Sequence, residues 1–154
     1  MLYSLILVVH SWFRWIVVMS LLYSLYRAYT GWLGKRVFTN FDNTIRHSVA
    51  TIAHIQLIFG LVLYGVSSII TFFLAHFRDA VHIREIRFFG LEHSITMVLA
   101  VSIITIGSMI AKRQSTDKSK FRTIAIWYTI AFFLIVAGIP WEFSPLISRP
   151  HFRF

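Results

Sequence analysis

The sequence predicts an all-α integral membrane protein, an up-down-up-down bundle of four helices in a single domain over residues 1–154. Hydrophobic residues make up 57% of the chain and charged residues 14%, whereas soluble domains average about 45–50% and about 25%. The apolar residues form four segments of about 20 residues or more, which is long enough to cross a bilayer. None of the segments alternates like a barrel strand, so helices are the only structure that can span.

The four segments cover about residues 2–29, 48–73, 88–111 and 123–140. No positive residues precede the first segment and no small-residue cleavage site follows it, so we expect a retained helix. The second segment carries Gly60 and Gly65 and the third carries Gly90 and Gly107, which we expect at helix–helix contacts. Short connections favour antiparallel neighbours, so the first and third helices should lie on one diagonal of the bundle.

The distribution of basic residues predicts the orientation in the membrane. The net charge is +9, and Lys and Arg gather in the connections 30–47 and 112–122, whereas the connection 74–87 is mixed. The positive-inside rule therefore places these two connections in the cytoplasm and both termini outside. We expect residues 75–86 to form a short interfacial helix and the tail 142–154 to lie along the outer surface. No basic face is interleaved with aromatic residues, so nucleic acid is not an expected partner.

The chain contains no cysteine. This excludes iron–sulfur clusters, thiolate ligands, disulfides and covalent haem attachment through a Cys-x-x-Cys-His motif. Any haem in this protein must therefore be held without covalent bonds, as a b-type haem.

Ionisable groups inside the apolar segments are candidate functional residues, because charge is costly in hydrocarbon. At about 1.5 Å per residue, His10 lies roughly 12 Å and His93 roughly 8 Å from the outer ends of their helices. The two histidines therefore share a level in the outer half and face each other across the diagonal. We predict that His10 and His93 are the axial metal ligands of one haem, with the low-spin iron suited to electron transfer. The alternative is that each imidazole is a hydrogen-bonded packing residue.

Arg14 and Glu92 accompany the two histidines. Arg14 follows His10 by one helical turn on the same face, where a guanidinium suits a haem propionate, another carboxylate or a substrate site. Glu92 points about 100° away from His93, from where it could orient an imidazole or relay protons. Alternatively, Arg14 and Glu92 neutralise one another in a structural pair.

His54 lies roughly 9 Å from the inner end of the second helix, too far from the level of His10 and His93. Its diagonal partner has no histidine, so one chain offers no second bis-histidine site; Tyr128 lies near the same depth. Three interpretations stay open for His54. It could line a quinone headgroup pocket with Gln56, bind a five-coordinate haem, or serve only in packing.

Four short motifs resemble a group of small four-helix bacterial membrane proteins, of the Bacteroidetes type, that are called cytochrome-b-like. The motifs are His10-x-x-x-Arg14-Trp15, Ala53-His54-Ile55-Gln56 leading to Gly60 and Tyr64, Arg87-Phe88-Phe89 to Glu92-His93, and Gly138-Ile139-Pro140-Trp141. The resemblance covers almost the whole chain and implies haem b in a bundle of the bacterial inner membrane, with a role in respiratory electron transfer. The larger two-haem cytochromes b need a second histidine pair, which this chain lacks, so one haem is expected.

The function predicted from the sequence is single-electron transfer by a membrane b-type cytochrome. It would act either as an electron-transfer protein or as a quinone-linked oxidoreductase. Its cofactor-binding residues would be His10, Arg14, His54, Glu92 and His93. Its partners would be the lipid bilayer and a redox partner such as quinone. The chain could also assemble with further copies of itself or with a larger respiratory complex. Two other functions stay open: a cofactor-free accessory subunit of a larger membrane complex, and a small proton-coupled transporter that uses Glu92, His54 and Arg14.

Overall fold

The computed structural model describes residues 2–141 and is all-α, which confirms the predicted fold class. Three of the spanning segments are each one uninterrupted helix: α1 (Leu2–Leu33), α2 (Asn40–Val66) and α7 (Asp117–Gly138). The fourth spanning segment combines α5 (Arg84–Arg87), the π-helical turn η1 (Phe88–Glu92) and α6 (His93–Arg113). By length and apolar character, these four segments can each cross a membrane.

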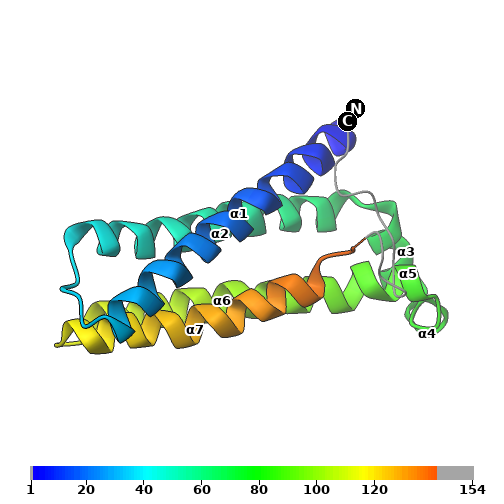
Figure 1. Cartoon of the computed structure of the whole chain (residues 1–154). Helices are drawn as coiled ribbons and strands as arrows, with labels where there is room; N and C mark the ends of the chain where they lie inside the picture. The colour runs from blue at the N-terminus through cyan, green and yellow to red at the C-terminus, as the bar shows by residue number, and fades with distance from the viewer. Residues whose placement is uncertain (1, 142–154) are drawn as a thin grey trace.

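The long helices run alternately up and down the bundle (Figure 1). α1 packs against α2 and α7, and α6 packs against the same two helices, so α1 and α6 lie on one diagonal as predicted. The start of α1 diverges from the other helices at the end of the bundle that carries α3 (Ser68–Ala75), α4 (Phe77–Ala80) and α5. We call this the outer end, and the end that carries the α1–α2 and α6–α7 connections the inner end.

The helices begin earlier than the apolar segments do. α2 starts at Asn40 because Thr39 and Asp42 form a capping box, in which each side chain bonds the other residue's backbone N–H. α7 starts at Asp117 because the Thr116 hydroxyl accepts a hydrogen bond from the Ser119 backbone N–H. The predicted starts at residues 48 and 123 were therefore wrong, since capped polar turns extend both helices into the inner end.

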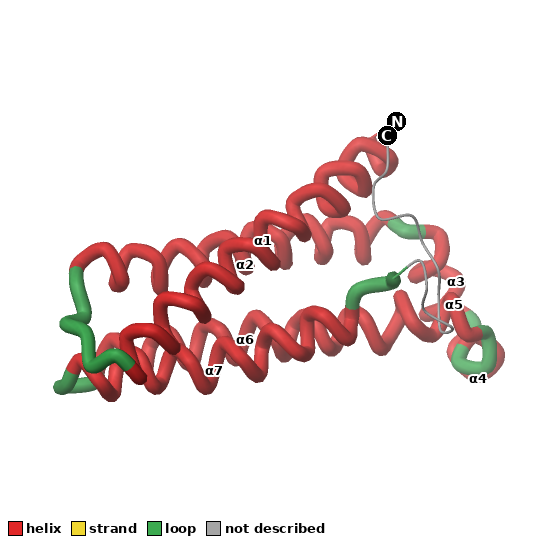
Figure 2. The backbone as a smooth tube through the Cα atoms, viewed as in Figure 1, coloured by secondary structure: helices red, strands yellow, loops and turns green. Residues whose placement is uncertain are grey.

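The second predicted segment, 48–73, is not one helix. α2 ends at Val66, and Ser67 has extended backbone angles that separate α2 from α3 (Figure 2). Between α3 and the fourth spanning segment the chain makes only the short turn of α4, so the single interfacial helix expected over residues 75–86 is not formed: α5 already begins at Arg84. The tail 142–154 lies outside the described residues.

The core of the bundle is built from small residues and a few large ones. Alanines at positions such as Ala28, Ala100 and Ala125 are almost fully buried and let the helices approach closely. The largest fully buried side chains are Tyr128, Phe121, Leu21, Ile104 and Val49. Many other large apolar side chains cover the outer surface, as expected for a protein that lipid surrounds.

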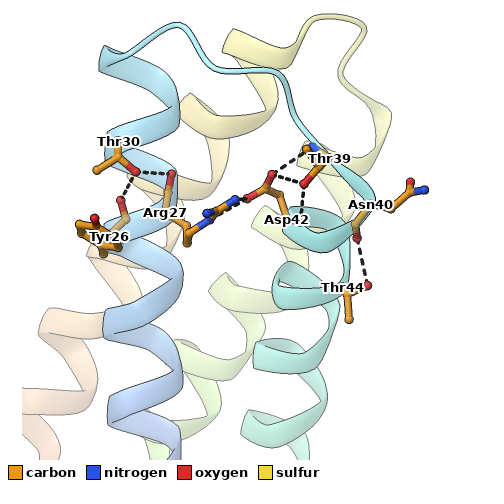
Figure 3. A network of polar contacts seen from close by, with 7 residues as sticks. All are labelled: Tyr26, Arg27, Thr30, Thr39, Asn40, Asp42 and Thr44. Atoms are coloured by element: carbon orange, nitrogen blue, oxygen red, sulfur yellow. Dashed lines mark hydrogen bonds and ion pairs between the residues drawn. The ribbon is translucent and has the colours of Figure 1, made fainter.

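Polar groups at the inner end have protein partners. Arg27 on α1 donates to the Asp42 carboxylate at the start of α2, 2.7 Å away, and Asp42 also accepts from Thr39 (Figure 3). The buried Arg46 donates to Asn43 and to both the hydroxyl and the carbonyl of Ser108 on α6. These bonds satisfy charged groups that would otherwise be costly in a low-dielectric interior.

The four glycines named from the sequence differ in their surroundings. A Cβ added at Gly107 would overlap Trp127 on α7, and one added at Gly90 would lie 2.5 Å from the Phe73 ring. A Cβ at Gly60 would contact His10 at 3.4 Å. These three lie at close contacts, as predicted. Gly65 does not, because its added Cβ would have no neighbour within 4 Å.

Gly107→Ala should therefore destabilise the protein, whereas Gly65→Ala should not. The new methyl at residue 107 has to push α6 from α7, at a cost of about 1–3 kcal/mol. The same change at residue 65 meets open space and should be neutral or stabilise by up to about 1 kcal/mol through helix propensity. Unfolding in mixed detergent micelles, followed by circular dichroism, measures both; an equal effect of the two changes would contradict the packing described.

Candidate functional site

A cavity of about 230 Å³ lies between the outer halves of the helices. It is lined from α1, α2, α3, η1, α6 and α7, mainly by apolar side chains. Its polar lining residues include His10, Arg14, Gln56, Tyr64 and His93. The cavity lies among residues at membrane depth, so these polar groups mark it as a candidate functional site.

The structure brings His10 and His93 together in this cavity. The two rings come from the diagonal helices α1 and α6, with centroids 6.5 Å apart and planes at 74°. The shared level and the diagonal arrangement predicted from the sequence are thus confirmed by the geometry. A metal ligand role for the two rings stays a prediction.

His93 is held in one orientation. Its Nδ1 lies 2.8 Å from the carbonyl oxygen of Gly138 at the end of α7. Because a carbonyl only accepts hydrogen bonds, Nδ1 carries the proton of the neutral ring, and Nε2 keeps its lone pair. Histidine ligands of metals typically have their second nitrogen bonded in this way, which fixes both tautomer and ring orientation.

His10 is held more loosely, through Gln56 on α2. The Gln56 amide nitrogen donates to the His10 backbone carbonyl at 3.0 Å and approaches the ring Nε2 at 3.4 Å, beyond the usual hydrogen-bond length. Within residues 2–141, His10 Nδ1 and Gln56 Oε1 are buried atoms with no hydrogen-bond partner. Buried polar atoms normally have a partner, so the cavity can accommodate a ligand that bonds to them.

Arg14 also lines the cavity, as expected from its position one turn after His10. Its guanidinium carbon lies 5.3 Å from the centroid of the Trp15 ring, within the range of a cation–π interaction. The cavity therefore combines two imidazoles with a guanidinium on the α1 wall. This arrangement suits a ligand that carries both a metal ion and an acidic group.

Glu92 does not line the cavity. Its side chain is exposed, and its carboxylate accepts a hydrogen bond of 2.7 Å from Arg87 Nε. The carboxylate partner of Arg87 is thus found five residues along the chain. The cofactor-binding role predicted for Glu92 finds no support in this position, and neither does its pairing with Arg14.

His54 does not line the cavity either. It is exposed on the outer surface, with Nδ1 donating to the Ala50 carbonyl at 2.7 Å and Nε2 3.3 Å from the Thr105 hydroxyl. Gln56 lines the cavity while His54 is exposed, so the interpretation that these two residues share a headgroup pocket finds no support in their positions. The local bonds of His54 fit the packing interpretation.

Sequence reasoning missed the roles of Gln56, Tyr64 and Gly138. Gln56 was assigned to His54, whereas it contacts His10, and Tyr64 was named only in the resemblance. The signal for Gln56 was available, because antiparallel helices joined at the inner end bring the outer part of α2 to the level of His10. The Gly138 carbonyl gave no signal, because every residue carries one.

Two imidazoles in one cavity are a donor set that a haem iron could use. The described part of the chain offers no group of three or more His, Asp or Glu that could hold a metal, whereas a porphyrin supplies the equatorial nitrogens and needs only axial ligands.

The cavity is small for a porphyrin, but it is open. Ligand pockets typically measure about 300–1,000 Å³, above the 230 Å³ found here. The lining residues Tyr3, Leu61 and Val98 are exposed on the surface. A flat apolar ring can therefore extend from the cavity into the opening.

Comparison with protein-family models, with curated proteins and with solved structures gives no match for this chain. The resemblance to cytochrome-b-like proteins accordingly stays a prediction.

Proposed function

We propose that this chain is a membrane b-type cytochrome that binds one haem between His10 and His93 and transfers single electrons. The observation that carries the proposal is the meeting of two imidazoles from diagonal helices in one cavity, with ring centroids 6.5 Å apart. Inward side chains on facing helices are how helical bundles build cofactor sites.

Each cavity residue has a distinct role in this proposal. His93 offers Nε2 because Gly138 holds its Nδ1 proton. His10 offers a ring nitrogen as the second ligand, and the Gln56 amide holds the His10 backbone through its carbonyl. Arg14 supplies positive charge to a haem propionate. The bound haem would supply the one-electron chemistry, and the apolar lining would exclude water from the iron.

The redox partner that we propose is a quinone, because the cavity opens at exposed apolar residues that lipid would surround. A lipid-soluble carrier can approach this opening from within the bilayer. No residue of the described chain is assigned to its headgroup. The enzymatic form of the proposal is therefore a quinone-linked oxidoreductase, and the simpler form is an electron carrier.

We propose the bacterial cytoplasmic membrane as the location, with the inner end of the bundle in the cytoplasm. Six exposed basic residues gather there, namely Lys35, Arg36, Lys112, Arg113, Lys118 and Arg122. The outer end mixes basic and acidic residues, including Arg78, Asp79, Arg84 and Glu85. Cytoplasmic connections are typically enriched in Lys and Arg, so the haem site would lie nearer the periplasm.

The protein purified after expression with haem supply should show a Soret band, and a sharp α band after reduction with dithionite. His10→Ala or His93→Ala should remove most of the dithionite-reduced spectrum, because each change removes an axial ligand. His54→Ala is the matched control and should keep the spectrum, since His54 lies outside the cavity.

Absence of haem bands from the wild-type protein would overturn the proposal. If the haem-free protein also co-purified with other membrane subunits in mild detergent, the accessory-subunit function would replace it. A proton flux in vesicles that depends on Arg14 would instead favour the transporter.

Gly60→Leu should lower haem occupancy at least about tenfold, because the new side chain grows toward the His10 ring and fills the cavity. Gly65→Leu is the control on the same helix, since its side chain meets open space. Haem per protein is measured by the pyridine haemochromogen absorbance. Equal occupancy in the two variants would contradict a haem beside Gly60.

A further inference from the structure

The spanning segment that carries His93 contains a π-helical turn immediately before it. η1 covers Phe88–Glu92, and the His93 backbone N–H bonds to the Phe88 carbonyl five residues earlier. Two side-chain contacts have the same spacing: Ser94 Oγ donates to the Phe89 carbonyl at 2.8 Å, and Arg87 pairs with Glu92. A π turn brings residues i and i+5 together, so these three contacts stabilise it jointly.

The π turn determines which way His93 faces. One extra residue in the turn rotates the following helix by about 100° relative to the preceding residues. In the structure, the π turn brings Arg87 and Glu92 together outside the cavity, and His93, the next residue, lines the cavity. π turns are rare and are frequent at functional sites, which agrees with a role in directing an imidazole.

Two contacts from outside the segment hold the π turn. Gly90 lies against the face of Phe73 on α3, too close for any Cβ. The Tyr64 hydroxyl on α2 donates to the Gly90 carbonyl at 3.0 Å. Tyr64 lies on the same helix as Gln56 and Gly60, which contact His10. α2 therefore contacts both sides of the histidine pair.

We propose that η1 is the element that directs His93 into the cavity, and that Tyr64 is a positioning residue that acts through the Gly90 carbonyl. The hydroxyl couples the backbone before His93 to α2, whose Gln56 bonds to the backbone of His10 on α1, so it helps to set the distance between the two imidazoles. The consequence for metal binding rests on the proposed haem function. The role of Tyr64 in holding the π turn does not.

Hydrogen exchange of the haem-free protein tests the structural part. Tyr64→Phe removes only the hydroxyl, and the loss of this hydrogen bond should speed amide exchange in peptides covering 88–94 by about five- to tenfold. Peptides from α7 should exchange as in the wild type. Tyr29→Phe is the matched control, because it removes a hydroxyl contact with Thr129 between α1 and α7 and should leave 88–94 unchanged.

Spectroscopy of the haem-loaded protein tests the positioning part. Tyr64→Phe should shift the low-spin ferric EPR signal and speed haem dissociation about five- to tenfold, whereas Tyr29→Phe should change neither. A change in exchange without a change in the haem signals would overturn the role in directing His93. Unchanged exchange would overturn the role of the hydroxyl in holding the turn.

The two proposals fail in different ways. A wild-type protein without haem would refute the cytochrome, while the exchange measurement would still decide whether Tyr64 holds the π turn. A wild-type protein with haem whose Tyr64→Phe variant matched it in exchange, EPR and dissociation would refute this inference alone.

Discussion

The hydrogen bond from His93 to the Gly138 carbonyl is the interaction on which the outer half of the bundle depends. It joins the first residue of α6 to the last residue of α7, where helical carbonyls lack partners within the helix. The same bond therefore caps α7 and orients the imidazole. The two helices approach closely at this point, where a Cβ built at Gly138 would overlap the terminal methyl group of Met97. One contact thus serves helix packing and, in the proposed cytochrome, the orientation of a haem ligand.

The buried polar groups at the two ends of the bundle differ in whether they have hydrogen-bond partners. At the inner end, the Arg27 and Arg46 side chains bond to carboxylate, amide, hydroxyl and carbonyl oxygens of neighbouring helices. At the outer end, His10 Nδ1 and Gln56 Oε1 are buried without a hydrogen-bond partner in the described chain. An unmet bond costs free energy and persists where function requires it. This contrast, rather than the number of polar residues, marks the outer cavity as the candidate site.

The sequence was sufficient for the four spanning segments and for the meeting of His10 with His93, because both follow from apolar length and antiparallel order. It was insufficient for the outward face of His54, since a membrane helix is apolar toward both lipid and core and gives no amphipathic signal. The pairing of Glu92 with Arg87 was missed because it spans a π turn, which brings residues five positions apart together. The early starts of α2 and α7 could be predicted from Thr39 and Thr116, because both residues are helix N-caps that hydropathy alone does not detect.

The rings of the two proposed ligands, His93 and His10, are held in place to different degrees. His93 has its tautomer fixed by a 2.8 Å bond, so its Nε2 needs no rearrangement before it binds a metal. The His10 Nε2 is approached only by the Gln56 amide at 3.4 Å, a contact weak enough to be exchanged at little cost. α1 also diverges from the bundle at this end (Figure 1). In the proposed cytochrome, His93 would hold the haem with its ring already oriented, whereas His10 would first have to exchange its contact with Gln56.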